Sequence, residues 1–333
     1  MFSIFVRAIP SLDGRARGHT VFVISWVNPD ERLAKKTFED YMLEGTLAAL
    51  TFIEQAVGEL EVNAIGYCLG GTLLASTLAY LSAKSDDRIP SATYFVTLVD
   101  FADVGDMAVF IDERQLASLE KRMQKRGYLD ARDMTTSFNM LRANDLIWPF
   151  VVNNYLLGKE PIPFDLLYWN SDATRMPAAM HSFYLRNMYH ENRLVKSGGI
   201  SLGGVPIDLH RIRTPSFLLS TREDHIAPWR STYAATQIYS APVKFVLSES
   251  GHIAGVINPP GSKYGHWQND ELPKTPDQWL EKATPVPGSW WPAWDEWVSQ
   301  FGGGTVAARD PGSGRLRAIE DAPGSHVRVR ATA

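Results

Sequence analysis

The sequence predicts an α/β protein in which helices flank a mostly parallel β-sheet and a helical insertion interrupts the strands. Three observations support this prediction. β-Rich apolar runs alternate with helical patterns up to residue 100, the alternation stops over residues 101–210, and strand patterns return from residue 215. The chain has 333 residues, of which 45% are hydrophobic and 21% charged. Such a chain can bury a large core, which excludes global disorder.

The first part of the sheet is predicted from short apolar runs separated by helices. Residues 20–26 (TVFVISW) form a β-rich run that ends at an Asn-Pro pair, which is typical of a buried strand. Apolar residues at helical spacing predict a helix over 38–57, and Gly58 is the expected cap that ends it. The next elements in order are a strand over 62–67, a helix over 70–83 and a strand over 93–100.

The later part of the chain divides into an insertion, a return to the sheet and a tail. Helix-like stretches with several prolines and many aromatics predict a helical insertion that caps one end of the sheet. Strand patterns then return at 215–221 and 243–248, with a helical pattern between them. We therefore assign 18–100 and 211–300 to the sheet core, 101–210 to the cap or lid, and 301–333 to a C-terminal tail.

Composition excludes several functions. The formal net charge of -4 and the pI near 6.1 give no electrostatic basis for binding nucleic acid or an anionic membrane. One cysteine allows no intrachain disulfide and no cysteine-based metal cluster, and no histidine pair has zinc-binding spacing, so no metal is expected. A long uncharged run that includes 65–83 divides into a strand and a helix, so no membrane span is expected. With no visible secretory signal, we expect a cytoplasmic protein.

The one cysteine lies in a Gly-x-Cys-x-Gly motif between a predicted strand and a predicted helix. This is the nucleophile-elbow pattern of the α/β-hydrolase fold, with Cys68 in place of serine. A sharp strand-to-helix turn needs small neighbours, which Gly66, Gly70 and Gly71 supply. The start of the following helix favours a thiolate and a developing oxyanion, and the Leu69 amide is the expected first oxyanion donor. Glycine both two residues before and two residues after a random cysteine occurs about once in 200, which favours a nucleophile over an inert buried thiol.

A cysteine nucleophile needs a base and an acid that orients the base. In the α/β-hydrolase fold the acid and then the histidine follow the nucleophile, on loops after late strands. Asp224 and His252 each follow a predicted late strand, in that order. Glu223 is an alternative acid one residue away. His225 is an alternative base, although residues adjacent in sequence rarely face each other, which favours His252 as the partner of Asp224.

Longer motifs surround these residues. The elbow at 66–71 reads GYCLGG, the acid segment at 220–229 reads STREDHIAPW, and the histidine segment at 250–260 reads SGHIAGVINPP. Further motifs are SWVNP at 25–29, DLLYWN at 165–170 and GSWWP at 288–292. Together they resemble polyhydroxyalkanoate synthases, and most closely the class I enzymes that make polyhydroxybutyrate-type polyesters. The likeness covers nearly the whole chain from Gly18 onward, and we expect the chain to lack the family's N-terminal region.

The resemblance implies an α/β-hydrolase fold with acyltransferase chemistry. Cys68 would attack the thioester of a short-chain (R)-3-hydroxyacyl-CoA, release CoA and hold the acyl group. His252 would form the thiolate and later deprotonate the 3-hydroxyl at the end of the growing polyester chain. Asp224 would orient His252 or help to activate that hydroxyl. No cofactor is implied, because CoA is the leaving group of the substrate, and the cap would exclude water.

The resemblance also implies a homodimer that works at the surface of polyester granules in the cytoplasm.

Two other functions fit the same residues. A thioesterase or a depolymerase with this fold would use water in place of the hydroxyl. An inactive truncated paralogue would associate with granules but release no CoA. It is favoured by the expected lack of the upstream loop that supplies a second oxyanion N–H in this fold.

Overall fold

The computed structural model describes residues 18–141, 147–160, 174–321, 324–325 and 328–329. The chain forms two compact units. The first, which we call the sheet unit, comprises Met1–Trp26, Glu39–Gly105 and Asn187–Asp321. The second, the helical unit, comprises Val27–Phe38, Asp106–Arg186 and Ala322–Ala333. The DLLYWN motif lies outside the described residues.

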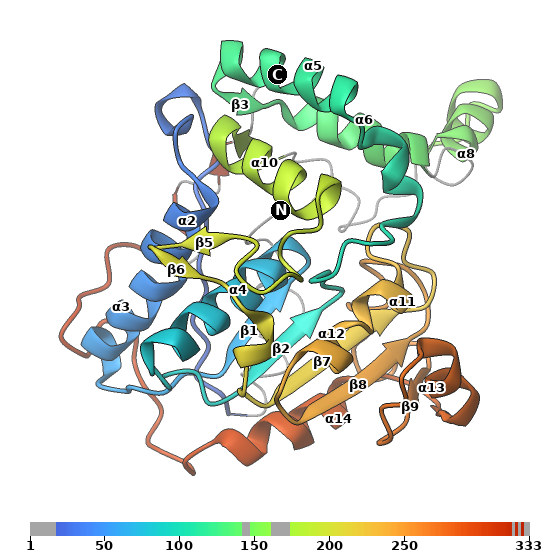
Figure 1. Ribbon diagram of the computed structural model, residues 1–333. Helices are drawn as coiled ribbons and strands as arrows, with labels where there is room; N and C mark the ends of the chain where they lie inside the picture. Colours follow the sequence, from blue (N-terminus) through green and yellow to red (C-terminus); the bar gives the residue numbers. More distant parts are fainter. Residues whose placement is uncertain (1–17, 142–146, 161–173, 322–323, 326–327, 330–333) are drawn as a thin grey trace. The chain divides into compact units, whose positions relative to one another are not determined.

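The described part of the sheet unit contains a six-stranded sheet in the order β1-β2-β7-β8-β9-β10 (Figure 1). The first four strands run parallel, and β9 and β10 are antiparallel to their neighbours. The mostly parallel sheet predicted from the sequence is therefore confirmed. The strands are β1 (Ala64–Tyr67), β2 (Ala92–Phe95), β7 (Ser216–Thr221), β8 (Val243–Ser248), β9 (His266–Gln268) and β10 (Thr284–Val286).

The central strands are buried along their length, as the apolar runs predict. Every residue of β2 and β7 is buried, which is typical of a parallel strand covered on both faces. The strand predicted over 93–100 is shorter in the structure. It ends at Phe95 because Val96 adopts a positive φ of 46°, which is incompatible with an extended ladder.

Helix α4 (Leu69–Lys84) packs on β1 and β2 and is buried around most of its surface. Its polar residues are tolerated there because their hydroxyls donate to backbone carbonyls. Thr72 donates to Leu98 O (2.7 Å), and Ser76 donates to Thr72 O (2.9 Å). The long uncharged run is thus a strand followed by a core helix. Among the described residues, no helix is long and apolar enough to cross a membrane.

The helix predicted over 38–57 forms as a continuous helical segment. It comprises α2 (Phe38–Asp40), the π-helical η3 (Tyr41–Leu47) and α3 (Ala48–Val57). Gly58 ends it in the left-handed conformation, with φ of 78°, and donates its N–H to Glu54 O (2.8 Å). This confirms the predicted glycine cap.

The strand predicted over residues 20–26 is wrong, because this segment forms no strand. Val21, Phe22 and Val23 are 36–43% exposed, and within the described residues β1 pairs with β2 alone. High β-propensity indicates a side chain that fits a pleated surface, but a strand also needs a neighbour with which to form a ladder.

The C-terminal tryptophans of the sheet unit complete its core. Trp297 packs against Phe217 of β7, with ring centroids 5.4 Å apart, and Trp279 packs edge-on against Phe245 of β8 at 4.8 Å. The remaining elements of this unit are β5 (Ser201–Leu202), β6 (Val205–Pro206), η7 (Leu209–Arg211), α11 (Trp229–Thr232), α12 (Ala235–Ile238), α13 (Pro276–Lys282), α14 (Trp291–Val298) and η8 (Ser299–Phe301).

The helical unit is held by side chains that converge on α5 (Glu113–Arg126). Arg186 forms an ion pair with Glu120 (2.6 Å) and another with Glu113 (3.0 Å). The other elements are η2 (Glu31–Leu33), η4 (Gly105–Phe110), β3 (Tyr128–Leu129), α6 (Ala131–Leu141), α8 (Trp148–Phe150), η5 (Val151–Leu156), β4 (Met176–Pro177), α10 (Ala178–Tyr184) and η6 (Leu185–His190). Three elements, α2, η4 and η6, extend past a boundary between the units.

Candidate active site

Cys68 occupies the sharp turn between β1 and α4. It has φ of 52° and ψ of -122°, a strained conformation for a residue with a side chain. Backbone hydrogen bonds hold it on both sides. Its N–H donates to Phe95 O (2.8 Å), and its carbonyl accepts from the N–H groups of Gly71 (2.9 Å) and Thr72 (3.2 Å). The geometry is that of the nucleophile elbow predicted from the motif.

Two of the predicted elbow glycines are explained by close approach of the backbone. A Cβ on Gly66 would lie 2.6 Å from the Cα of Gly71 and 2.8 Å from the carbonyl oxygen of Gly70. A Cβ on Gly71 would lie 1.9 Å from Oγ1 of Thr97, just beyond β2. The strand and the following helix can therefore approach each other closely only because these positions lack side chains.

The close contact at Gly71 gives a test of the elbow's packing. Gly71→Ala should destabilise the fold by about 1–3 kcal/mol or more, because the new methyl group overlaps the Thr97 side chain. Urea unfolding followed by circular dichroism measures the loss. Gly303→Ala is the matched control, since a Cβ on Gly303 meets nothing within 4 Å. Equal unfolding midpoints for the two variants would contradict the packing that we describe.

His252 and Asp224 form a buried pair. Nδ1 of His252 lies 2.7 Å from Oδ2 of Asp224, and the residues are 4% and 8% exposed. Oδ1 of Asp224 accepts two more hydrogen bonds, from the N–H groups of Ile226 (2.8 Å) and Ala227 (2.9 Å). Both carboxylate oxygens are thus engaged inside the protein. Of the two candidate acids, the structure pairs Asp224 with His252 and leaves Glu223 exposed.

The electrostatics of His252 link this pair to Cys68. Burial alone would lower the pKa of His252, but the charges of Asp224 and Cys68 outweigh it and raise the pKa to about 10. The other ring nitrogen, Nε2, is buried and has no hydrogen-bond partner among the described residues. Burial first, and then the charges of Cys68 and Asp224, also raise the pKa of Tyr67 well above its usual range. The elbow, the acid and the histidine therefore form one electrostatic cluster.

The raised pKa of His252 predicts a pH dependence of stability. The imidazolium stabilises the folded state fully below the unfolded pKa of 6.5, and this contribution is lost as the pH rises toward about 10. We expect the free energy of unfolding of wild type to exceed that of His252→Gln most at pH 6, and the difference to shrink by pH 9. Urea titrations across this range measure it. A difference that is constant with pH would contradict the assignment.

The first turn of α4 supplies backbone N–H groups beside Cys68. Leu69 is the first residue of the helix, and the amides at the start of a helix have no acceptor within it. The helix dipole adds partial positive charge at the same place. Leu69 therefore lies at the start of the helix, directly after Cys68, where the motif predicts the first oxyanion donor.

Sequence reasoning missed the residues that hold the histidine segment. The Tyr67 hydroxyl donates to the carbonyl of His252, and the indole N–H groups of Trp290 and Trp291 donate to the carbonyls of Gly255 and Val256. These residues belong to two of the quoted motifs, GYCLGG and GSWWP. The motifs indicate that these residues are important, but they do not indicate which residue each one contacts.

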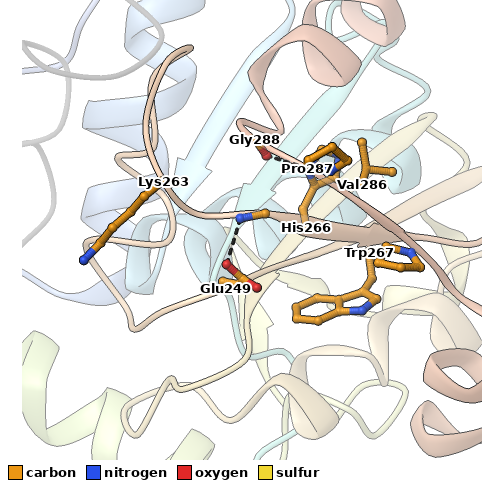
Figure 2. A pocket seen from close by; sticks show the side chains of 9 residues that line it. Glu249, Lys263, His266, Trp267, Val286, Pro287 and Gly288 are labelled. Carbon is orange, nitrogen blue, oxygen red and sulfur yellow. Dashed lines mark hydrogen bonds between the residues drawn. The ribbon is translucent and has the colours of Figure 1, made fainter.

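A pocket of about 360 Å³ lies beside the last two strands (Figure 2). Glu249 faces the N–H of Gly265 (2.8 Å), His266 contacts the carbonyl of Gly288 (2.9 Å), and Lys263 points away from the other labelled side chains. Its lining residues are Glu249, Lys263, Gly265, His266, Trp267, Pro285, Val286, Pro287 and Gly288, and they include no candidate catalytic residue. Over the described ranges, no group of three His, Cys, Asp or Glu residues could hold a metal ion.

The parallel sheet, the elbow and the late acid and histidine loops together define a class of protein. The model of the alpha/beta hydrolase fold family matches residues 1–259, and the chain belongs to this family. Within it, the chain is a homologue of poly(3-hydroxyalkanoate) polymerases, which are acyltransferases. This confirms the fold class and the resemblance inferred from the motifs.

Three relatives show the extent of the similarity. The chain is 56% identical over 316 residues to the poly(3-hydroxyalkanoate) polymerase subunit PhaC of Rhizobium meliloti, covering 95% of this chain and 51% of that protein. It is 52% identical over 318 residues to the polymerase of Methylorubrum extorquens, covering 95% and 52%. It is 42% identical over 322 residues to PhaC of Cupriavidus necator, covering 95% and 55%. The chain spans about half the length of these curated relatives.

Proposed function

We propose that this chain carries the acyl-transfer site of a polyhydroxyalkanoate synthase that uses short-chain (R)-3-hydroxyacyl-CoA. The observation that supports this most is the placement of Cys68 in a nucleophile elbow that shares one electrostatic cluster with the buried pair of His252 and Asp224. The identity of 42–56% to poly(3-hydroxyalkanoate) polymerases supports the same activity.

In the first step, the thiolate of Cys68 attacks the thioester carbonyl of the substrate. A carbon–sulfur bond to Cys68 forms, and the negative charge that develops on the carbonyl oxygen is stabilised by the N–H of Leu69. The bond to the CoA sulfur then breaks, and the departing CoA thiolate takes a proton from the His252 imidazolium. The acyl group stays on Cys68 as a thioester, so it remains a good donor for the next step.

In the second step, neutral His252 accepts the proton of a 3-hydroxyl group at the end of the polyester chain. The oxygen attacks the acyl group on Cys68, an ester bond forms, and the Cys68 thiolate leaves beside the regenerated imidazolium. Both oxygens of Asp224 are already engaged, and its side chain is 0% exposed. We therefore assign Asp224 to orienting His252 in both steps, in preference to contacting the hydroxyl itself.

Water and partners complete the proposal. The cap at 101–210 would exclude water, which otherwise competes with the hydroxyl.

A homodimer at the surface of cytoplasmic polyester granules would require an exposed apolar surface. Within the described part of the helical unit, exposed apolar side chains occur close together at Trp148, Phe150, Tyr155, Leu156 and Leu157.

One experiment tests this function against the two alternatives. The purified chain is incubated with (R)-3-hydroxybutyryl-CoA, the released CoA is measured with a thiol reagent, and the products are separated into polymer and free acid. We expect CoA release with polymer. Free acid alone would indicate a thioesterase or depolymerase, and an absence of CoA release from a folded chain would indicate an inactive granule-associated paralogue. A full-length polymerase serves as the positive control.

A further inference from the structure

The loop that carries the candidate base, residues 249–258, is here called the histidine loop. Two buried indole groups from the start of α14 donate hydrogen bonds to it. The Nε1–H of Trp290 donates to Gly255 O (3.1 Å), and the Nε1–H of Trp291 donates to Val256 O (3.2 Å). The two tryptophans are 1% and 4% exposed, so neither hydrogen bond can be exchanged for one to water without a movement of the loop.

A third donor reaches the same loop from the nucleophile side. Tyr67, which directly precedes Cys68, donates its hydroxyl to the carbonyl of His252 itself. Its ring also lies edge-on to the imidazole, with ring centroids 5.5 Å apart and planes at 89°. One side chain of the elbow therefore contacts both the backbone and the ring of the candidate base.

Phe95 at the end of β2 connects the two groups of donors. Its carbonyl accepts the N–H of Cys68 (2.8 Å). Its ring packs edge-on against Tyr67, at 6.3 Å and 76°, and against Trp290, at 5.2 Å and 61°. The nucleophile and the histidine loop are thus linked through one continuous set of packed aromatic rings.

The histidine loop needs such support because it is not part of a regular element. Its internal backbone hydrogen bonds form short successive turns. The N–H of Gly255 donates to Gly251 O (2.9 Å), those of Val256 and Ile257 donate to Ile253 O (3.1 and 2.8 Å), and that of Asn258 donates to Val256 O (3.0 Å). Its second residue, Ser250, has a strained conformation with φ of 69°. A loop built in this way takes its position from outside partners, and rigid aromatic donors fix that position at small entropic cost.

We propose that Tyr67, Trp290 and Trp291 act as an aromatic clamp, a set of positioning residues that holds His252 at the right distance from Cys68. The catalytic importance of this clamp rests on the proposed function. The clamp itself can be tested without substrate, because loss of one of its hydrogen bonds should weaken the coupling between His252 and Cys68 in the free protein.

The test measures how fast iodoacetamide alkylates Cys68 as a function of pH. Cys68 is the one cysteine of the chain, so the reaction reports on this site alone. The titratable groups whose charges act on His252 are Cys68 and Asp224, and Tyr67 lies against its ring. Trp291→Phe and Tyr67→Phe each remove one donor and keep an aromatic ring. At pH 6.5 we expect each variant to react about 10-fold more slowly than wild type, and the acid limb of the profile to move to higher pH.

Trp294→Phe is the matched control. Trp294 lies in the same helix, is buried, and donates its indole N–H to Oγ1 of Thr93 (3.0 Å), away from the histidine loop. Trp294→Phe removes the same side-chain volume and one indole hydrogen bond, as Trp291→Phe does. We therefore expect Trp294→Phe to be less stable than wild type but to keep the wild-type alkylation profile. The clamp is overturned if Trp291→Phe and Tyr67→Phe keep the wild-type profile, or if Trp294→Phe shifts it equally. CoA release by wild type tests the proposed function separately.

Discussion

Cys68→Ala is expected to abolish CoA release from 3-hydroxybutyryl-CoA, with a loss of about 10⁴-fold or more. The reason is that the proposed mechanism has one covalent acyl carrier, and neither His252 nor Asp224 can replace the thiolate. Alanine removes only the sulfur atom and keeps the Cβ in the elbow, so the fold should persist. The measurement is the initial rate of CoA release by purified wild type and variant, with circular dichroism as the check on folding.

The structure offers a way to separate the loss of the nucleophile from damage to the elbow. Gly71→Ala disturbs the packing of the same turn but leaves the thiol in place. We expect Cys68→Ala to keep the wild-type unfolding midpoint and lose activity, and Gly71→Ala to lose stability. A folded Cys68→Ala variant that turns over the substrate at the wild-type rate would contradict the mechanism.

Asp224→Asn is expected to lower the rate by about 10³–10⁴-fold. The amide oxygen of asparagine can still accept from the N–H groups of Ile226 and Ala227, which leaves its NH₂ group facing Nδ1 of His252. Nδ1 must then become the acceptor, so the proton moves to Nε2 and the neutral ring can no longer act as a base toward Cys68. Loss of the carboxylate also lowers the pKa of His252.

Glu223 provides the control, because it is an exposed acid that directly precedes Asp224 in the sequence. Glu223→Gln should keep the activity within about twofold of wild type, as is usual for a surface charge. Rapid-quench measurements then separate acylation of Cys68 from the later elongation. If Asp224 serves His252, both steps slow together in Asp224→Asn. Slowing of elongation alone would show that Asp224 acts on the attacking hydroxyl.

The parts of the fold that the sequence predicts well are those with a strong local signal. β7 (SFLLST) and β8 (VKFVLS) are short apolar-rich runs, and the structure places them within one residue of the predicted bounds. The elbow was equally predictable, because its turn imposes glycine at fixed offsets from Cys68. Asp224 and His252 were predicted because each follows a late strand, in the order nucleophile, acid, histidine that is typical of this fold.

The elements that were predicted poorly depend on contacts between distant residues. β9 and β10 are short, with the sequences HWQ and TPV. β9 becomes a strand because β8 offers an edge with which to pair, and β10 then pairs with β9. Residues 20–26 show the opposite case, in which a β-rich run has no ladder among the described strands. The aromatic clamp joins Tyr67 to His252 across 185 positions of sequence, a contact that local patterns do not reveal.

The most direct test of the central claim is to trap the acyl-enzyme. The purified chain is mixed with (R)-3-hydroxybutyryl-CoA, quenched in acid, digested and analysed by mass spectrometry. We predict one 3-hydroxybutyryl group, or a short oligomer of it, on the peptide that contains Cys68, and none on Cys68→Ala. An acyl group on another residue, or release of CoA with no adduct at Cys68 at any quench time, would contradict the assignment of Cys68 as the nucleophile.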